Sequence, residues 1–252
     1  CATQMEQYQM RQILVLLLCL PLVVNGSEDQ AKLIINEMEK LYRGNSSEVS
    51  LTMQVETPQY SRSLEIFGQT LGKERAIFRI ISPKKDKGIT TLRRDKEMWN
   101  FFPKINKVIK VPPSMMMGSW MGSDFTNDDL VQETKLVEEY DLELIIDSET
   151  FLIILTPKEE TISLWGKIDY LVQKDPLLPL KQSFFDDYGK KVRELVYKDP
   201  KLFAGRLLPS AMEMVPLNKP GHITKLFYNQ IEFEPEGVSE KSFSLRELKK
   251  RI

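Results

Sequence analysis

Few residues in this chain could act in catalysis. The 252 residues include one histidine, His222, and two cysteines, Cys1 and Cys19. A serine nucleophile needs a base, and His222 is the only histidine that could serve, but no G-x-S-x-G motif accompanies it. We therefore expect no catalytic residue and no enzymatic activity. A hydrolase of envelope lipids is the alternative that a catalytic role for His222 would revive.

The adjacent carboxylates Asp128-Asp129 and Asp186-Asp187 are the other candidates for acid–base chemistry. Side chains of neighbouring residues diverge on a helix or a strand, so helix capping and turn formation explain both pairs better. The sequence also contains no G-x-G-x-x-G, G-x-x-x-x-G-K-[ST], H-E-x-x-H or C-x-x-C motif. We therefore expect no nucleotide, no metal and no other cofactor.

The charges nearly cancel, since 35 Lys and Arg face 36 Asp and Glu for a net charge of −1. Nucleic-acid binders are usually basic overall or carry a basic stripe, so we expect no nucleic-acid partner. Hydrophobic residues make up 42% of the chain and charged residues 28%, which is enough apolar surface for a folded core.

One segment has the composition of an apolar binding surface. Residues 111–125 read VPPSMMMGSWMGSDF. Methionine is flexible and polarisable, so a surface rich in it adapts to varied apolar partners. Two interpretations stay open: a mobile lip or lid over a lipid-binding cavity, or a loop that plugs the core. The candidate ligand-binding residues in this segment are Met115, Met116, Met117, Trp120, Met121 and Phe125.

Two neighbouring segments allow similar alternatives. Trp99 and Phe101 share one face of an expected strand, where they could line the same cavity or belong to the core. Lys84, Lys85 and Lys87 form a basic loop that is either a solvated turn or a site of attraction to anionic headgroups.

These residues must be positioned by a mainly β fold. Alternating apolar residues predict strands with one buried and one solvated face, joined by hairpins because no α-helical crossover intervenes. The expected strands lie near residues 51–55, 61–70, 74–82, 88–94, 106–111, 140–147, 149–156, 162–172, 180–187, 191–198, 208–215 and 222–233. We expect about ten or eleven strands from these segments to form a large curved sheet or barrel.

A few helices complete this expectation. The segment 28–42 places Leu33, Ile34, Met38 and Leu41 at helical spacing, which predicts an amphipathic helix that closes the sheet. Capping patterns predict short helices at 127–133 and from Ser244 onward.

The N-terminal region is typical of an export signal. Met10-Arg11 precedes twelve apolar residues at 13–24, too few to span a membrane, and Val24-Asn25-Gly26 suits cleavage. We expect residues 1–9 to be upstream sequence, 10–26 a signal peptide cleaved after Gly26, and 27–252 one domain. An uncleaved anchor is the alternative. Leu18 before Cys19 is too large for a lipoprotein signal.

The segment 78–130 resembles the outer-membrane lipoprotein-sorting, LolA-like family. The resemblance rests on Phe78-Arg79, Ser82-Pro83, Trp99 to Pro103, Ile109 to Ser114 and Met121 to Leu130, and it extends to Phe243–Leu248. It implies a half-open antiparallel β-barrel of the LolA/LolB type, with helical lid elements around an apolar cavity. It also implies an inner-strand arginine that holds the lid shut, for which Arg79 is the positional candidate.

The resemblance further implies a function. We expect a monomeric periplasmic carrier that takes acyl chains of lipids or lipoproteins from an inner-membrane transporter of the ABC or RND type to an outer-membrane acceptor. The run Met115–Met117 departs from the polar or basic residues common in the family after Pro-Pro-Ser, so the cargo class stays open. The alternative is an accessory subunit of an RND-type exporter whose barrel is filled by its own side chains.

Overall fold

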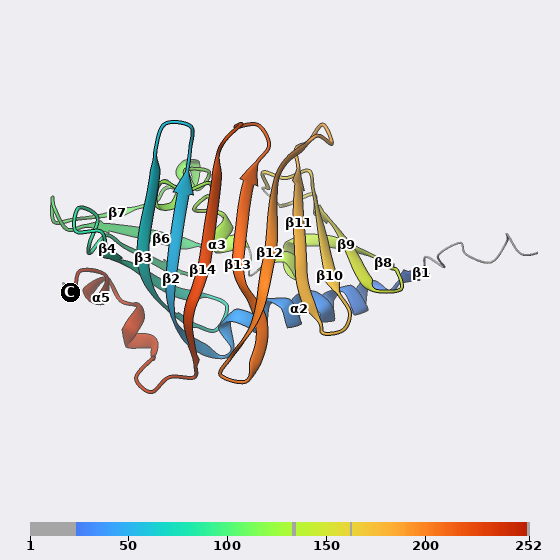
Figure 1. The fold of residues 1–252 in the computed structure, drawn as a ribbon, viewed down its shortest axis with the longest axis horizontal. Helices are drawn as coiled ribbons and strands as arrows, with labels where there is room; N and C mark the ends of the chain where they lie inside the picture. The colour runs from blue at the N-terminus through green and yellow to red at the C-terminus, as the bar shows by residue number, and fades with distance from the viewer. Residues whose placement is uncertain (1–23, 133–134, 162, 251–252) are drawn as a thin grey trace, which may run out of the picture.

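Period-two alternation produces one large antiparallel sheet that curls around a helix (Figure 1). The structure is a computed structural model that describes residues 24–132, 135–161 and 163–250. The sheet order is β1-β8-β9-β10-β11-β12-β13-β14-β2-β3-β4-β5-β6-β7. Over the described ranges, β1 and β7 do not pair with each other, so the sheet stays open, as the half-open barrel requires.

The strands are β1 (Val24–Gly26), β2 (Ser46–Glu56), β3 (Ser61–Leu71), β4 (Arg75–Ser82), β5 (Thr90–Arg94), β6 (Glu97–Phe102), β7 (Lys107–Lys110), β8 (Tyr140–Ile146), β9 (Thr150–Pro157), β10 (Lys167–Gln173), β11 (Leu178–Phe185), β12 (Lys191–Phe203), β13 (Arg206–Pro216) and β14 (Ile223–Phe233). The helical elements are α2 (Glu28–Arg43), η1 (Pro113–Met115), η2 (Trp120–Gly122), α3 (Asp129–Gln132), α4 (Leu136–Glu139), η3 (Glu240–Phe243) and α5 (Leu245–Leu248).

The strand count is fourteen in the described chain, higher than the ten or eleven expected. Strand β1 has only three residues, too few to show a period-two pattern. Strand β6, expected around Trp99 and Phe101, carries large apolar side chains on both faces. The strand expected at 162–172 begins only at Lys167. The Ser163 hydroxyl accepts a hydrogen bond from the Trp165 amide (3.0 Å), a local turn that competes with strand pairing.

Helix α2 lies against the concave side of the sheet (Figure 1). Its start is capped by the Ser27 hydroxyl, which accepts a hydrogen bond from the Gln30 amide at 3.2 Å. Its buried face consists of Ala31, Ile34, Ile35, Met38, Glu39 and Tyr42. The expected apolar stripe was therefore wrong at Leu33, whose side chain is 67% exposed.

Two apolar clusters lie on opposite faces of the sheet, and β4 contributes to both. The larger cluster fills the concave side and includes α2. The smaller one lies on the outer face, where Phe243 and Leu248 of the C-terminal segment cover Ile77, Leu92 and Phe101. Strand parity decides which cluster each side chain joins, since successive residues point to opposite faces.

Most of the expected signal segment, residues 10–23, lies outside the described residues, as do residues 1–9, Cys19 and Ile162. Residues Val24–Gly26 form β1 and pair with Leu144–Ile146 of β8. Cleavage after Gly26 would therefore remove this edge strand. No helix in the described ranges is both long enough and apolar enough to cross a membrane.

Candidate functional site

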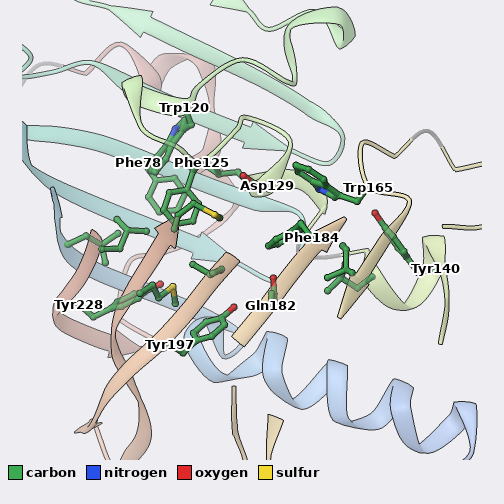
Figure 2. A pocket seen from close by; sticks show the side chains of 18 residues that line it. Phe78, Trp120, Phe125, Asp129, Tyr140, Trp165, Gln182, Phe184, Tyr197 and Tyr228 are labelled. Atoms are coloured by element: carbon green, nitrogen blue, oxygen red, sulfur yellow. The ribbon is translucent and has the colours of Figure 1, made fainter. Parts of the chain in front are cut away.

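An apolar cavity lies on the concave side of the sheet, above α2 (Figure 2). Its volume is about 140 Å³. Figure 2 shows Phe78, Trp120 and Phe125 at one end and Tyr140, Trp165 and Phe184 at the other. The lining residues are Leu51, Phe78, Trp120, Phe125, Asp129, Leu130, Leu136, Tyr140, Trp165, Ile168, Gln182, Phe184, Leu195, Tyr197, Met212, Met214, Leu226 and Tyr228.

Strand alternation accounts for most of this lining. Leu195 and Tyr197 on β12, like Met212 and Met214 on β13, are two positions apart and so share a face of the sheet. Aromatic rings stabilise both ends: Phe78 and Trp120 pack edge to face with ring centroids 5.5 Å apart, and the Trp165–Phe184 centroids are 5.2 Å apart. The cavity is therefore built mainly from rigid strand positions.

The cavity is covered by the lid segment, residues 112–132, which contains η1, η2 and α3. Asn127 organises this segment from within. Its side-chain amide donates hydrogen bonds to the backbone carbonyls of Met115 (3.2 Å) and Gly118 (3.1 Å). Its backbone N–H donates to the same Gly118 carbonyl (3.0 Å). A buried asparagine thus folds the Met-rich loop into a defined shape.

An ion pair attaches the start of α3 to the sheet. Arg193 of β12 donates to both carboxylate oxygens of Asp129, at 2.8 Å for Nη1–Oδ2. The Arg193 guanidinium also lies 4.2 Å from the ring centroids of Trp165 and Phe184. Its side chain is only 5% exposed and that of Asp129 18% exposed, so this pair is largely removed from water.

Three further polar contacts attach the lid segment to inner-face residues. Arg93 of β5, which is 1% exposed, donates to the Leu130 carbonyl at 2.7 Å. Trp120 Nε1 donates to Thr91 Oγ1 at 3.2 Å. The Thr224 hydroxyl of β14 donates to the Asp124 carboxylate at 2.8 Å. The lid is therefore held by buried polar groups of the sheet as well as by apolar packing.

One carboxyl group of the lid segment has a raised pKa. Burial, reinforced by the negative charges of Asp129 and Glu139, raises the pKa of Asp128 to about 6. Burial also raises the pKa of the Tyr140 phenol. Tyr140 forms a hydrogen bond with the Ser163 hydroxyl at 2.8 Å.

Two of the predicted ligand-binding residues, Trp120 and Phe125, line the cavity. Met121 packs against the same inner cluster and faces a neighbouring hollow of about 600 Å³, which Met115 also lines. Met115 and Met117 are exposed and Met116 is half-buried. The structure therefore places Met115, Met116 and Met117 at the outer side of the lid segment, whereas Met121 faces inward.

The structure does not bring Trp99, Phe101 or Arg79 to this cavity. Phe101 is buried in the outer cluster and Trp99 packs against it. Arg79 donates to the Glu247 carbonyl of α5 at 2.7 Å, so it holds the C-terminal segment and not the lid. Since Ile77 of the same strand belongs to the outer cluster, Arg79 shares its face by strand parity.

Sequence reasoning missed the arginines that hold the lid, Arg93 and Arg193, and the aromatic end formed by Trp165 and Phe184. The alternation of β12 could have indicated that Arg193, Leu195 and Tyr197 share one face. Nothing in the sequence pattern shows which face of β5 lies inward.

The described residues offer little for catalysis or metal binding. His222 Nδ1 lies 3.8 Å from Asp124 Oδ1, and none of its hydrogen bonds in the described chain joins it to a serine or threonine hydroxyl. No group of three or more His, Cys, Asp or Glu side chains in this part of the protein could hold a metal ion.

Solved structures with the same fold come from several bacteria. A domain from Vibrio parahaemolyticus, described as an outer membrane lipoprotein-sorting protein domain, has a TM-score of 0.77 at 20% identity and covers 89% of this chain and 100% of its own. A DUF1329 family protein from Desulfovibrio piger has a TM-score of 0.75 at 20% identity, covering 88% of this chain and 98% of its own.

A LolA superfamily protein from Nitrosomonas europaea is also similar, with a TM-score of 0.71 at 18% identity over 86% of this chain and 98% of its own. A search of curated proteins finds no match. A family model described as "Uncharacterized protein" matches residues 72–250. The chain therefore belongs to the family of this model, and its fold is the LolA-like fold of the lipoprotein-sorting structures.

Proposed function

We propose that this protein is a non-enzymatic carrier that binds acyl chains of lipids or lipoproteins beneath its lid segment. The observation that carries the proposal is the apolar, aromatic-ended cavity under a lid held by the buried arginines Arg93 and Arg193. Apolar burial contributes about 0.8 kcal/mol per CH2, so ten to twenty methylenes would contribute on the order of 8–16 kcal/mol before ordering costs.

The described conformation represents the closed state in this proposal. Ligand sites usually enclose roughly 300–1,000 Å³, and the cavity here holds about 140 Å³. An acyl chain therefore needs the lid segment to move. Trp120 lines this cavity and the adjacent Met121 lines the hollow of about 600 Å³, so displacement of η2 would join the two spaces.

The carrier proposal is tested by filling the cavity. Leu226 lines it from β14, and Leu226→Trp should place an indole where the chain would lie. We expect wild-type protein, purified without detergent, to bind a fluorescent fatty acid and Leu226→Trp to lose at least tenfold in affinity, a loss of about 1.4 kcal/mol. Leu71→Trp is the control, because Leu71 packs against the outer cluster. Equal affinity in all three proteins would remove the cavity from the site.

The second candidate is an accessory subunit of an RND-type exporter with a self-filled barrel, and the small cavity volume favours it. Asp129→Asn distinguishes the two, because it weakens the ion pair that attaches α3 to β12. A carrier should take up the fatty-acid probe faster in this variant. If neither wild type nor Asp129→Asn takes up the probe, the carrier proposal fails and the self-filled barrel is favoured.

The remaining parts of the proposal follow from the carrier function. We place the protein in the periplasm after removal of a signal peptide near Gly26, with the domain formed by residues 27–252. The donor would be an inner-membrane transporter of the ABC or RND type and the acceptor would lie at the outer membrane. Native mass spectrometry of periplasmic protein tests the signal-peptide cleavage and the cargo, since it reports the processed N-terminus, the oligomeric state and any co-purifying acylated species.

A further inference from the structure

Six exposed lysines gather at one end of the sheet and belong to none of the contacts described for the cavity. They form the lysine patch: Lys84, Lys85, Lys87, Lys104, Lys107 and Lys110. The first three lie in the loop between β4 and β5, and the others in the loop between β6 and β7 or on β7 itself. The net charge of the whole chain is −1, so these lysines are a local excess of positive charge.

Antiparallel pairing brings these loops together. Strand β4 ends where β5 begins, and β6 ends where β7 begins, so both loops lie at the same end of four adjacent strands, at the left of Figure 1. The loops touch: a Cβ built on Gly88 would lie 3.3 Å from Cγ of Pro103. The two loops therefore lie side by side.

The lysines have few internal partners. Lys110 pairs with Glu97, while in the described part of the chain no carboxylate pairs with Lys84, Lys85, Lys87, Lys104 or Lys107. Asp86, the acidic residue of the first loop, forms an ion pair with Arg62, whose Nη2 lies 3.1 Å from Asp86 Oδ2. The positive charge of the patch is therefore available to an external anionic partner.

Large apolar side chains stand among the lysines. Ile105 is 58% exposed and Ile109 is 47% exposed. Met115 of the lid segment is 61% exposed and lines the hollow of about 600 Å³ together with Ile109 and Phe102. Apolar side chains surrounded by flexible lysines are typical of surfaces that lie in a membrane interface, because lysine stems cover apolar surface while their charges reach the headgroups.

We propose that the lysine patch docks this protein on an anionic phospholipid bilayer, with Ile105, Ile109 and Met115 at the boundary between headgroups and acyl chains. Charge complementarity supports this partner. The composition favours a bilayer over an acidic protein, because protein–protein interfaces are depleted in lysine and enriched in arginine. The exposed cations of the two loops are lysines, and Arg62 beside them is paired with Asp86. Docking would present the hollow beside the lid segment to the lipid surface.

This inference goes beyond the carrier function and is measured separately from it. Flotation with phosphatidylcholine vesicles, with or without about one-third phosphatidylglycerol, reports docking without any acyl probe. We expect binding only to the anionic vesicles, and expect it to weaken when salt rises from about 0.05 to about 0.5 M. Equal binding to both vesicle types, or no binding to either, would overturn the proposal.

Matched variants assign the binding to the patch. Each exposed lysine near an anionic surface strengthens binding about fivefold, so Lys104→Gln with Lys107→Gln should weaken docking about 25-fold. The control is Lys190→Gln with Lys201→Gln, which removes the same charge from exposed positions on other hairpins and should leave docking unchanged. Equal losses in both double variants would overturn the assignment.

Fatty-acid binding in solution separates the two proposals. The Lys104/Lys107 variant should bind the fluorescent fatty acid like wild type, since neither lysine lines the cavity. A protein that docks but binds no fatty acid would refute the carrier function alone. Binding of the patch to an acidic protein in the absence of vesicle docking would refute the bilayer proposal and assign the surface to a protein partner.

Discussion

Two segments cover opposite faces of the same strands, and they are held in different ways. The lid segment lies over a cavity and is attached by the Arg193–Asp129 ion pair and by the hydrogen bond from Arg93 to the Leu130 carbonyl. The C-terminal strap, residues 239–250, places Phe243 and Leu248 directly in the outer apolar cluster. The lid segment is attached by polar contacts and lies over a cavity, whereas the strap is packed directly into an apolar cluster. Movement of the lid would therefore open a less tightly packed part of the interior than movement of the strap.

The two segments nevertheless share one kind of attachment, an arginine of the sheet that donates to a backbone carbonyl. Arg93 of β5 and Arg79 of β4 each donate to a backbone carbonyl of a short helix, Leu130 in α3 and Glu247 in α5. Their strands are neighbours, with Ala76 opposite Arg93 and Thr90 opposite Arg79. The two arginines differ in face, and the face decides which segment each one holds.

Removal of the strap's main anchor should have the largest effect on stability. Phe243 is 2% exposed, so Phe243→Ala should lower the free energy of unfolding by about 3–5 kcal/mol through lost burial and the cavity it leaves. Urea denaturation measures the loss. Because Phe243 lies on the outer face, fatty-acid affinity should not change.

Phe125→Ala is the matched substitution in the lid, where Phe125 is 8% exposed and lines the cavity. It should alter both stability and fatty-acid affinity. If Phe243→Ala changed the affinity as strongly as Phe125→Ala does, the distinction between the two segments would be wrong.

Exchange of each arginine for methionine sharpens the comparison further. Arg93→Met should lower the free energy of unfolding by about 2–3 kcal/mol, since it removes a buried charged donor that bonds to the carbonyls of Leu130 and Lys73. Arg79→Met should cost only about 1 kcal/mol, because Arg79 is half-buried.

Protease sensitivity locates the two effects. Limited proteolysis should find new cleavage in the lid segment for Arg93→Met and in the strap for Arg79→Met. Cleavage of the lid in Arg79→Met would restore the sequence-based expectation that this arginine is the latch.

Arg93 and Arg79 show which parts of the fold and of the site can be predicted from the sequence. The alternation of apolar residues predicted most strands, and the helix at 28–42 was found at Glu28–Arg43. The resemblance led to the LolA-like fold and selected Arg79 as latch, but a one-residue step along a strand reverses the face. Which face of β4 and β5 is concave depends on how the whole sheet curls, and that is a property of all the strands together.

The aromatic residues illustrate the same limit. Trp120 and Phe125 were predicted beside the cavity, and they line it. Trp99 and Phe101 are the same two residue types and were predicted there as well, but they belong to the outer cluster. The outer cluster exists because the C-terminal strap returns to cover β5 and β6. Contacts between residues 99–101 and 243–248 are too distant in sequence for local patterns to reveal.

The smallest expected effect concerns the pH response of the lid. Asp128 precedes α3, and its amide donates to the Met116 carbonyl at 2.8 Å. Its surroundings are dominated by the carboxylates of Asp129 and Glu139, opposed by Arg193 and Lys135, and burial is the largest cause of its raised pKa of about 6.

The sign of the effect follows from the direction of the shift. Between pH 4 and the folded pKa of about 6, folded protein keeps the Asp128 proton while unfolded protein, with a pKa of 3.8, releases it. The stability contributed by this group is fully present below about pH 4 and is lost as the pH rises through about 6. Asp128→Asn, which stays neutral, should therefore be about 1 kcal/mol more stable than wild type at pH 7, after allowance for solvent screening, and equal to it near pH 4.

The measurement is the difference in free energy of unfolding between wild type and Asp128→Asn across pH 4 to 7. Asp186→Asn serves as the control, because Asp186 lies in the hairpin between β11 and β12, away from the lid. A constant difference over this range would mean that Asp128 is ionised in the folded protein. If the difference develops as expected, hydrogen exchange at pH 7 should be faster in the wild-type lid than in the Asp128→Asn lid. The strap should exchange alike in both proteins, which would tie the pH response to the polar attachments of one segment.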